Sequence, residues 1–194
     1  WTPGVVFDPL TFRFEAWRDH WGAANLVNGD AEVFTFCAAQ VRERGFIRPC
    51  EDLKAFSGTV IGAEDLLNWQ RRVWDQSQSS EDSPLLTPLT PVVVSSLKTI
   101  TREWRTWVVG GEVVAWSQYA YHGKRARTRD VPSNVLSFAQ KLADYWCPAD
   151  AFVLDVGEVD GKLGLVEINT LNSSGIYEAD MVAVYSAIAD LYRP

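Results

Sequence analysis

Residues 152–169 read FVLDVGEVDGKLGLVEIN, and this stretch says more about the fold than any other part of the chain. The Asp-Gly pair at 160–161 separates two runs rich in apolar residues and predicts a hairpin turn that folds the second strand back beside the first. Side chains alternate along a strand, so Glu167 and Asn169 are expected on one face, with apolar neighbours on the other.

Asp155 lies on the first of these two strands. An Asp, a Glu and an Asn on one surface suit a hard cation such as Mg²⁺, which takes oxygen ligands and usually keeps phosphate oxygens and waters as well. The candidate metal ligands are therefore Asp155, Glu167 and Asn169. The alternative is the solvent-facing polar side of a hairpin, which explains the alternation but not the near-absence of Lys on the same face.

The composition is that of a globular protein: 194 residues, 47% apolar and 22% charged, with room for one core or two small lobes. A formal charge of −7 argues against a general nucleic-acid binder, so any polyanionic ligand needs a local basic cluster. No apolar run approaches the roughly 18 residues of a membrane span, and no basic segment precedes an apolar one at the N-terminus. A cytoplasmic protein is expected, without membrane contact.

Cys37, Cys50 and Cys147 are odd in number and lack CxxC spacing. This pattern implies neither a disulfide framework nor a zinc site, and reduced, buried thiols are expected. The chain begins at Trp1, which suggests that sequence upstream is missing.

Apolar periodicity and turn residues predict a mixture of helices and strands, with antiparallel strands in the second half, and this order is typical of an α+β fold. Residues 77–91 are polar and proline-rich and are expected to form a loop. The expected helices are 31–44, 63–76, 132–146 and 177–192, and the expected strands are 46–48, 60–61, 91–95, 103–109, 112–119 and the two strands of residues 152–169.

Two short motifs place cations on strands. Arg48 leaves the strand of residues 46–48, and Lys54 follows six residues later, so the two could clamp neighbouring phosphates. Glu103 and Arg105 share a strand face before the Gly-Gly pair of residues 110–111, as an ion pair or with Arg105 facing a ligand. Either motif alone is weak evidence.

Residues 122–129 read HGKRARTR and concentrate cations in an acidic protein. An anion-binding loop and a solvated loop explain this segment almost equally well. Gln118 and Tyr119 on the preceding strand slightly favour the functional interpretation.

Other catalytic patterns are incomplete. Residues 95–98 match SxxK, but no KTG follows and the chain has no GxSxG. The only histidines, His20 and His122, lie near no Cys or Ser in a recognisable arrangement. Neither GxxxxGK[ST] nor GxGxxG occurs, so glycine loops of those kinds are not what would hold a nucleotide.

Three segments occur together in the order seen in ATP-grasp enzymes: FIRPCEDLKAF at 46–56, EWRTWVVGGEVV at 103–114 and VEINTLNSSGIY at 166–177. The chain resembles that superfamily over most of its length, and in particular uncharacterised ATP-grasp proteins of phages and bacteria. The last two segments are fairly specific, and the ordered combination is more so.

The resemblance implies an ATP-grasp fold in which two α+β lobes with largely antiparallel sheets enclose a nucleotide cleft. It implies ATP bound through Mg²⁺ held by Asp155, Glu167 and Asn169, with Arg105 facing the γ-phosphate and Lys54 as a second catalytic cation. Arg48 stands where most members have a Lys, and Ser95 to Lys98 occupy the adenine hinge, where a Glu is more usual. The expected nucleotide-binding residues are Arg48, Lys54, Ser95, Ser96, Lys98, Glu103, Arg105 and Lys124.

The resemblance also implies three regions. Residues 1–45 would be a truncated or remnant segment preceding the ATP-grasp domain, 46–96 the N-terminal nucleotide-binding lobe and 97–194 the C-terminal lobe with the metal site. Related enzymes carry a further α/β domain before the lobes, which helps to bind the acceptor.

The activity implied by the resemblance is an ATP- and Mg²⁺-dependent carboxylate-amine ligase that acts through an acylphosphate on small-molecule or peptide substrates. Lys124, Arg125 or Arg127 would hold an acidic acceptor or close over the phosphates. One alternative is a non-catalytic nucleotide-binding or interaction protein that keeps the fold. Another is a kinase-like phosphotransferase whose product is a phosphate ester. The acceptor and the oligomeric state are not readable from the sequence.

Overall fold

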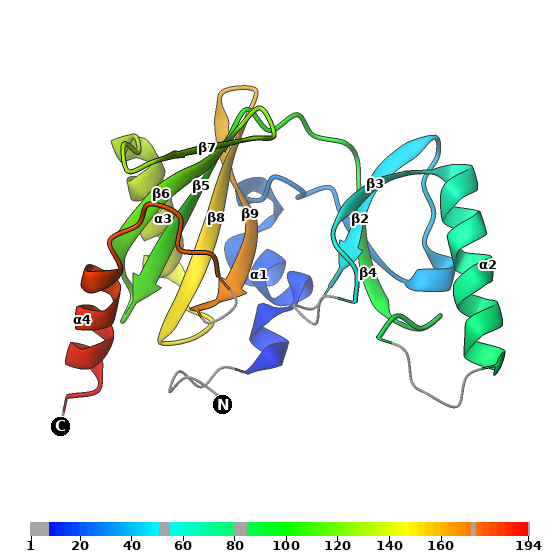
Figure 1. Cartoon of the computed structure of the whole chain (residues 1–194), viewed down its shortest axis with the longest axis horizontal. Coiled ribbons are helices and arrows are strands. Elements are labelled where there is room, and N and C mark those ends of the chain that lie inside the picture. The colour runs from blue at the N-terminus through cyan, green and yellow to red at the C-terminus, as the bar shows by residue number, and fades with distance from the viewer. Residues whose placement is uncertain (1–7, 51–54, 80–84, 172–173, 194) are drawn as a thin grey trace. The chain divides into compact units, whose positions relative to one another are not determined.

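The computed structural model describes residues 8–50, 55–79, 85–171 and 174–193 (Figure 1). The chain divides into two compact units. The larger unit comprises Trp1–Phe12, Ala16–Gly29 and Lys98–Pro194, and the smaller unit comprises Arg13–Glu15 and Asp30–Leu97.

The described strands of the larger unit form an antiparallel sheet in the order β7-β6-β5-β8-β9. Tight turns join β5 to β6, β6 to β7 and β8 to β9, and both residues of each turn have positive φ, as two-residue hairpins of this kind require. The strand bounds are β5 Arg102–Val109, β6 Glu112–Tyr121, β7 Lys124–Thr128, β8 Ala151–Val159 and β9 Lys162–Thr170.

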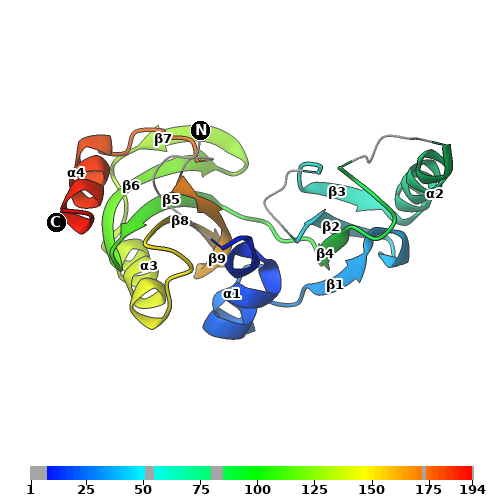
Figure 2. The same cartoon turned by 90° about the horizontal axis from the view of Figure 1, so that it is seen from below.

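Helices α3 (Ser133–Tyr145) and α4 (Met181–Leu191) lie on opposite faces of this sheet (Figure 2). On the α4 face, Val184 joins Trp107 and Val153 in one buried apolar cluster. That cluster covers only part of the face, and the polar residues described below lie on its remainder.

On the opposite face, α3 packs against β5, β6 and β8, and the end of α1 (Phe14–Trp21) packs against α3. The indole Nε1 of Trp21 donates a hydrogen bond of 2.8 Å to the carbonyl of Leu142 in α3, and both side chains are buried. Two short 3-10 helices, η1 (Pro9–Phe12) and η2 (Ala23–Asn25), contact β9.

The smaller unit contains an antiparallel sheet in the order β1-β4-β2-β3 and the helix α2 (Ala63–Ser79). Leu66 and Val73 of α2 pack against Ile47 of β2 in a second apolar cluster. The other bounds are β1 Glu32–Thr35, η3 Phe36–Ala38, β2 Arg44–Pro49, β3 Thr59–Gly62 and β4 Pro91–Ser95.

The predicted α+β class and the antiparallel sheets are confirmed. The strands expected near residues 46, 60, 91, 103, 112 and 152–169 all form, as do the helices expected at 63–76 and 132–146. Among the described residues no helix is both long and apolar enough to cross a membrane.

The helix predicted for residues 31–44 is wrong. The segment contains β1 and η3 instead, and β1 pairs with β4 from Glu32↔Val94 to Thr35↔Pro91. The side-chain Nε2 of Gln70 in α2 donates to the carbonyls of Phe36 and Ala39, which a continuous helix would have bonded internally. Partners distant in sequence therefore override the local apolar spacing.

Two other segments differ from expectation. Residues 124–128, taken as part of a loop, form the edge strand β7. The last helix begins at Met181 and not at Tyr177, because Asp180 caps it by accepting hydrogen bonds from the backbone N–H groups of Val182 and Ala183.

Candidate nucleotide and metal site

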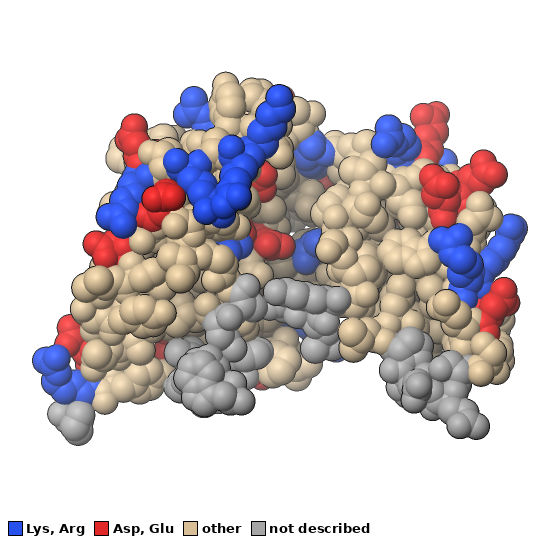
Figure 3. Space-filling model, viewed as in Figure 1, with Lys and Arg blue, Asp and Glu red and all other residues tan. Residues whose placement is uncertain are grey.

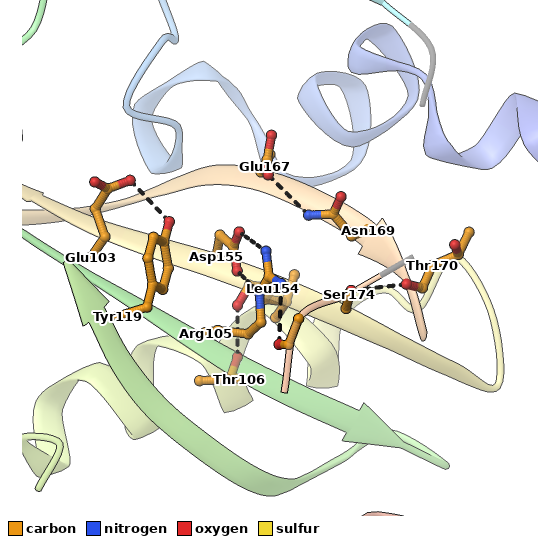
Figure 4. A network of polar contacts seen from close by, with 11 residues as sticks. Glu103, Arg105, Thr106, Tyr119, Leu154, Asp155, Glu167, Asn169, Thr170 and Ser174 are labelled. Atoms are coloured by element: carbon orange, nitrogen blue, oxygen red, sulfur yellow. Dashed lines mark hydrogen bonds and ion pairs between the residues drawn. The ribbon is translucent and has the colours of Figure 1, made fainter. Parts of the chain in front are cut away.

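Three charged side chains form a row across the larger sheet (Figure 4). Arg105 on β5 lies opposite Asp155 on β8, which lies opposite Glu167 on β9. Directly opposed residues of antiparallel strands share a face, so the three side chains emerge on the same side of the sheet. They come from positions far apart in the sequence.

Arg105 and Asp155 form a buried, bidentate ion pair. Nε of Arg105 donates to Oδ1 of Asp155 at 2.8 Å, and Nη2 donates to Oδ2 at 2.7 Å. The side chains are 8% and 1% exposed. Two parallel charge-assisted bonds fix the guanidinium plane, which gives Arg105 one orientation above the sheet.

The surroundings of Asp155 carry excess negative charge. Burial raises the pKa of Asp155, Arg105 opposes this, and the carboxylates of Glu167 and Glu103 raise it further. One guanidinium thus serves a neighbourhood of three carboxylates. A divalent cation would balance the remainder.

Glu103 lies on β5 where the pairing with β6 is irregular. Glu103 pairs with Ala120 and Trp104 with Gln118, which leaves Tyr119 as the extra residue of a bulge. The Tyr119 hydroxyl donates to Oε2 of Glu103 at 2.9 Å. Burial raises the pKa of Glu103, this hydrogen bond lowers it, and the charge of Glu167 raises it.

Glu167 and Asn169 point to the same side of β9, as the alternation predicted. Nδ2 of Asn169 donates to Oε1 of Glu167 at 3.0 Å (Figure 4). A second irregularity pairs Asp155 with Glu167 and Val156 with Leu165, so Val166 is the extra residue of that bulge. This bulge keeps Glu167 opposite Asp155.

Two tyrosines surround the guanidinium of Arg105. Its Cζ lies 5.7 Å from the ring centroid of Tyr119 and 5.1 Å from that of Tyr177. The two rings are stacked with centroids 5.0 Å apart. On β7, Arg127 places its own Cζ 5.1 Å from the Tyr177 ring, so this ring contacts two guanidinium groups.

Tyr177 is a residue that the sequence interpretation missed, because it was assigned to the last helix. It has φ +52°, a left-handed conformation that is uncommon for a side chain of this size. The neighbouring carbonyl of Gly175 accepts a 3.4 Å hydrogen bond from Nη1 of Arg105. The Gly-Ile-Tyr sequence after the β9 motif was the available signal.

The donor set fits Mg²⁺, because it consists of two carboxylates and an amide oxygen without sulfur or imidazole. Both oxygens of Asp155 already accept hydrogen bonds from Arg105, whereas Glu167 and Asn169 bond mainly each other. The described residues contain no group of three His, Cys, Asp or Glu side chains suited to a metal, so the amide of Asn169 is needed to complete the set.

In the smaller unit, Arg48 and Ser95 share the sheet face opposite α2. Arg48 pairs with Val93, and Ser95 pairs with Phe46, whereas Ile47 faces the α2 cluster. The guanidinium of Arg48 lies 5.4 Å from the Phe14 ring centroid, and its Nη1 donates to the carbonyl of Pro49 at 3.3 Å.

The remaining predicted residues are more scattered. Ser96 is exposed, and its hydroxyl and backbone N–H both bond Oδ2 of Asp30, a contact that sequence reasoning missed. Lys98 is half-buried at the start of a segment of the larger unit, and Lys124 is exposed on β7. Lys54 lies outside the described residues.

The two antiparallel sheets and the Arg105, Asp155, Glu167 and Asn169 constellation define an ATP-grasp domain, as the resemblance predicted. More particularly, residues 15–188 match the family described as ATP-grasp domain, R-to-K clade family 3, and the chain belongs to that family. A search of curated proteins gave no match.

Solved structures show the same fold at low sequence identity. The ATP-grasp ligase PsnB complexed with a minimal precursor has a TM-score of 0.58 and 13% identity over 95% of this chain and 61% of that one. D-alanine–D-alanine ligase from Bacillus anthracis has 0.59 and 11% over 92% and 62%. D-cycloserine synthetase DcsG has 0.62 and 12% over 94% and 71%. The chain thus spans about 61% of the length of PsnB.

Proposed function

We propose that the chain binds ATP with Mg²⁺ and joins a carboxylate to an amine. The observation that carries this proposal is the row Arg105, Asp155 and Glu167 with Asn169 beside it, which combines a fixed guanidinium with a divalent-cation donor set. Related support comes from PsnB, solved with a minimal precursor, Mg and ADP, and from the B. anthracis ligase, solved with ATP. Use of ATP makes the cytoplasm the expected compartment.

In this proposal Glu167, Asn169 and Asp155 hold the metal, which would neutralise phosphate charge and orient the phosphates. Arg105 is held rigidly by Asp155 and offers its remaining N–H groups to the γ-phosphoryl oxygens. Arg48 and Lys54 neutralise the other phosphates. Ser95, Ser96 and Lys98 lie beside the adenine.

The reaction has two steps. A substrate carboxylate oxygen attacks the γ-phosphorus, the bond between that phosphorus and the bridging oxygen breaks, and ADP leaves with an acylphosphate formed. An amine nitrogen then attacks the acyl carbon, inorganic phosphate leaves, and the nitrogen loses a proton to give the amide. No protein nucleophile is needed, because positioning and charge neutralisation carry phosphoryl transfer.

The metal assignment is tested by titrating a fluorescent ATP analogue with and without Mg²⁺. Glu167→Gln keeps the shape and removes the charge, so we expect it to weaken Mg²⁺-dependent binding about tenfold or more, the range of a lost charged contact. Glu112→Gln, at an exposed position at the start of β6, is the matched control and should bind as the parent does. Equal binding by the Glu167 variant would contradict the assignment.

Catalysis is tested separately by ADP release in the presence of amino acids and peptides, with hydroxylamine added to trap an acylphosphate as a hydroxamate. Mass analysis distinguishes an amide product from a phosphate ester. ATP binding without turnover on any carboxylate would instead support the non-catalytic nucleotide-binding alternative.

A further inference from the structure

The strand β7 carries an exposed row of cations. Lys124, Arg125 and Arg127 lie on the strand and Arg129 follows it, and all four are exposed. Figure 3 shows Lys and Arg side chains gathered over the part of the larger unit that contains β7. This concentration is notable because the chain has a formal charge of −7.

β7 is also an edge strand. In the described part of the chain it pairs with β6 alone, so its other side presents unpaired backbone N–H and C=O groups. Such an edge accepts a further strand through main-chain hydrogen bonds, and the side chains along it set the specificity.

The two arginines of β7 lie on the face of the sheet that bears the candidate site. Arg125 pairs with Ala120, which pairs with Glu103, and Arg127 contacts the Tyr177 ring. The alternate residues Ala126 and Thr128 line a cavity of about 400 Å³ on the other face. A peptide strand added to β7 would therefore direct every second side chain toward Arg125, Arg127 and the site.

The positive charge of this edge is not compensated by nearby carboxylates. Among the residues that the structure describes, Lys124, Arg125 and Arg127 form no ion pair, while the Nε of Arg129 donates to the backbone carbonyl of Glu178. Pairing of β7 with β7 of a second copy would set cation against cation, which disfavours self-association through this edge.

We propose that β7 binds an extended peptide segment whose Asp or Glu side chains, at every second position, contact Arg125 and Arg127. The segment adds as a further strand, so backbone hydrogen bonds and charge complementarity act together. This names the acceptor class of the ligase and in that respect rests on the proposed function. Cations that merely protect an edge from aggregation would not need to gather on the site face.

The test is a fluorescence-anisotropy titration without nucleotide, which makes it independent of ATP binding. The probe is a labelled peptide of about seven residues, the length of an ordinary strand, that alternates Glu and Val. We expect saturable binding, and about tenfold or more weaker binding when every Glu is replaced by Gln.

Two variants separate a specific site from general attraction. Arg125→Gln with Arg127→Gln should weaken peptide binding about tenfold or more, since two charged contacts are lost. Lys141→Gln with Lys162→Gln removes the same charge from exposed positions elsewhere in the larger unit and should leave binding unchanged. An equal loss in both pairs would overturn the site, and circular dichroism checks that each variant folds.

Strand addition is tested with the same peptide carrying backbone N-methyl groups at alternate residues, in each of the two registers. One register should abolish binding and the other should preserve it, because only one set of N–H groups faces β7. Equal binding of both peptides, tighter binding of a single-stranded oligonucleotide of equal charge, or no binding at all would overturn the proposal.

Discussion

At the scale of single residues, Arg105 and Asp155 place opposite charges in a nearly dry part of the sheet. Replacing one partner leaves the other buried without compensation, which costs about 3–5 kcal/mol. We predict that Arg105→Met lowers the free energy of unfolding by this amount in urea denaturation. The two hydrogen bonds of 2.8 and 2.7 Å and the 1% exposure of Asp155 are the reason.

The paired variant Arg105→Met with Asp155→Leu distinguishes stability from function. Replacing both charges by apolar groups is often neutral for stability, so the double variant should be more stable than the single one while ATP binding stays impaired. A double variant as unstable as Arg105→Met would show that the pair is not the source of the cost.

Tyr177 also belongs to this scale, because its ring contacts the guanidinium groups of both Arg105 and Arg127. We predict that Tyr177→Phe keeps ATP binding, whereas Tyr177→Leu weakens it by roughly fivefold, since a cation–π contact contributes about 1 kcal/mol. Anisotropy titrations of the two variants check this. Weakening by Phe as large as by Leu would assign the role to the hydroxyl instead of the ring.

The shared face of Glu167 and Asn169 could be predicted from strand alternation alone. The partner of Asp155 could not, because the neighbour of β8 is β5, which lies 50 residues earlier in the sequence at the ion pair. Local sequence specifies which side a residue faces, and strand order decides what it meets there. Tyr177 escaped prediction for a related reason, since its left-handed backbone is not a property of helical spacing.

At the scale of elements, the hairpins were the most predictable features. Gly110-Gly111 and Asp160-Gly161 tolerate the positive φ that a two-residue turn requires, so the signal is local. Residues 31–44 show the opposite case. Their apolar spacing fits a helix, yet pairing with β4 about 60 residues later and the Gln70 hydrogen bonds determine the structure.

Helix α4 provides a matched comparison of buried and exposed positions. Val184 is 0% exposed in the cluster with Trp107, and Val182, on another side of the same helix, is 76% exposed. We predict that Val184→Ala lowers the free energy of unfolding by about 2 kcal/mol and that Val182→Ala changes it little. Both substitutions alter helix propensity equally, so urea denaturation isolates packing, and equal effects would contradict the cluster.

At the scale of the whole molecule, each unit has its own sheet and its own apolar cluster, and the two clusters share no residue. The sequence predicted the α+β class because hairpin and helix patterns are local. The pairing of β1 with β4 was beyond it, because that contact joins segments about 60 residues apart.

The separate clusters predict that core damage stays within one unit. Leu66 is 2% exposed and belongs to the cluster of the smaller unit, so Leu66→Ala should destabilise that unit by about 2–5 kcal/mol. Native-state hydrogen exchange followed by mass spectrometry should then show faster exchange in β1 to β4 and α2, with β5, β6 and β8 keeping their protection. Val184→Ala should give the reverse pattern. Equal acceleration in both units by either variant would show that the two clusters unfold as one cooperative core.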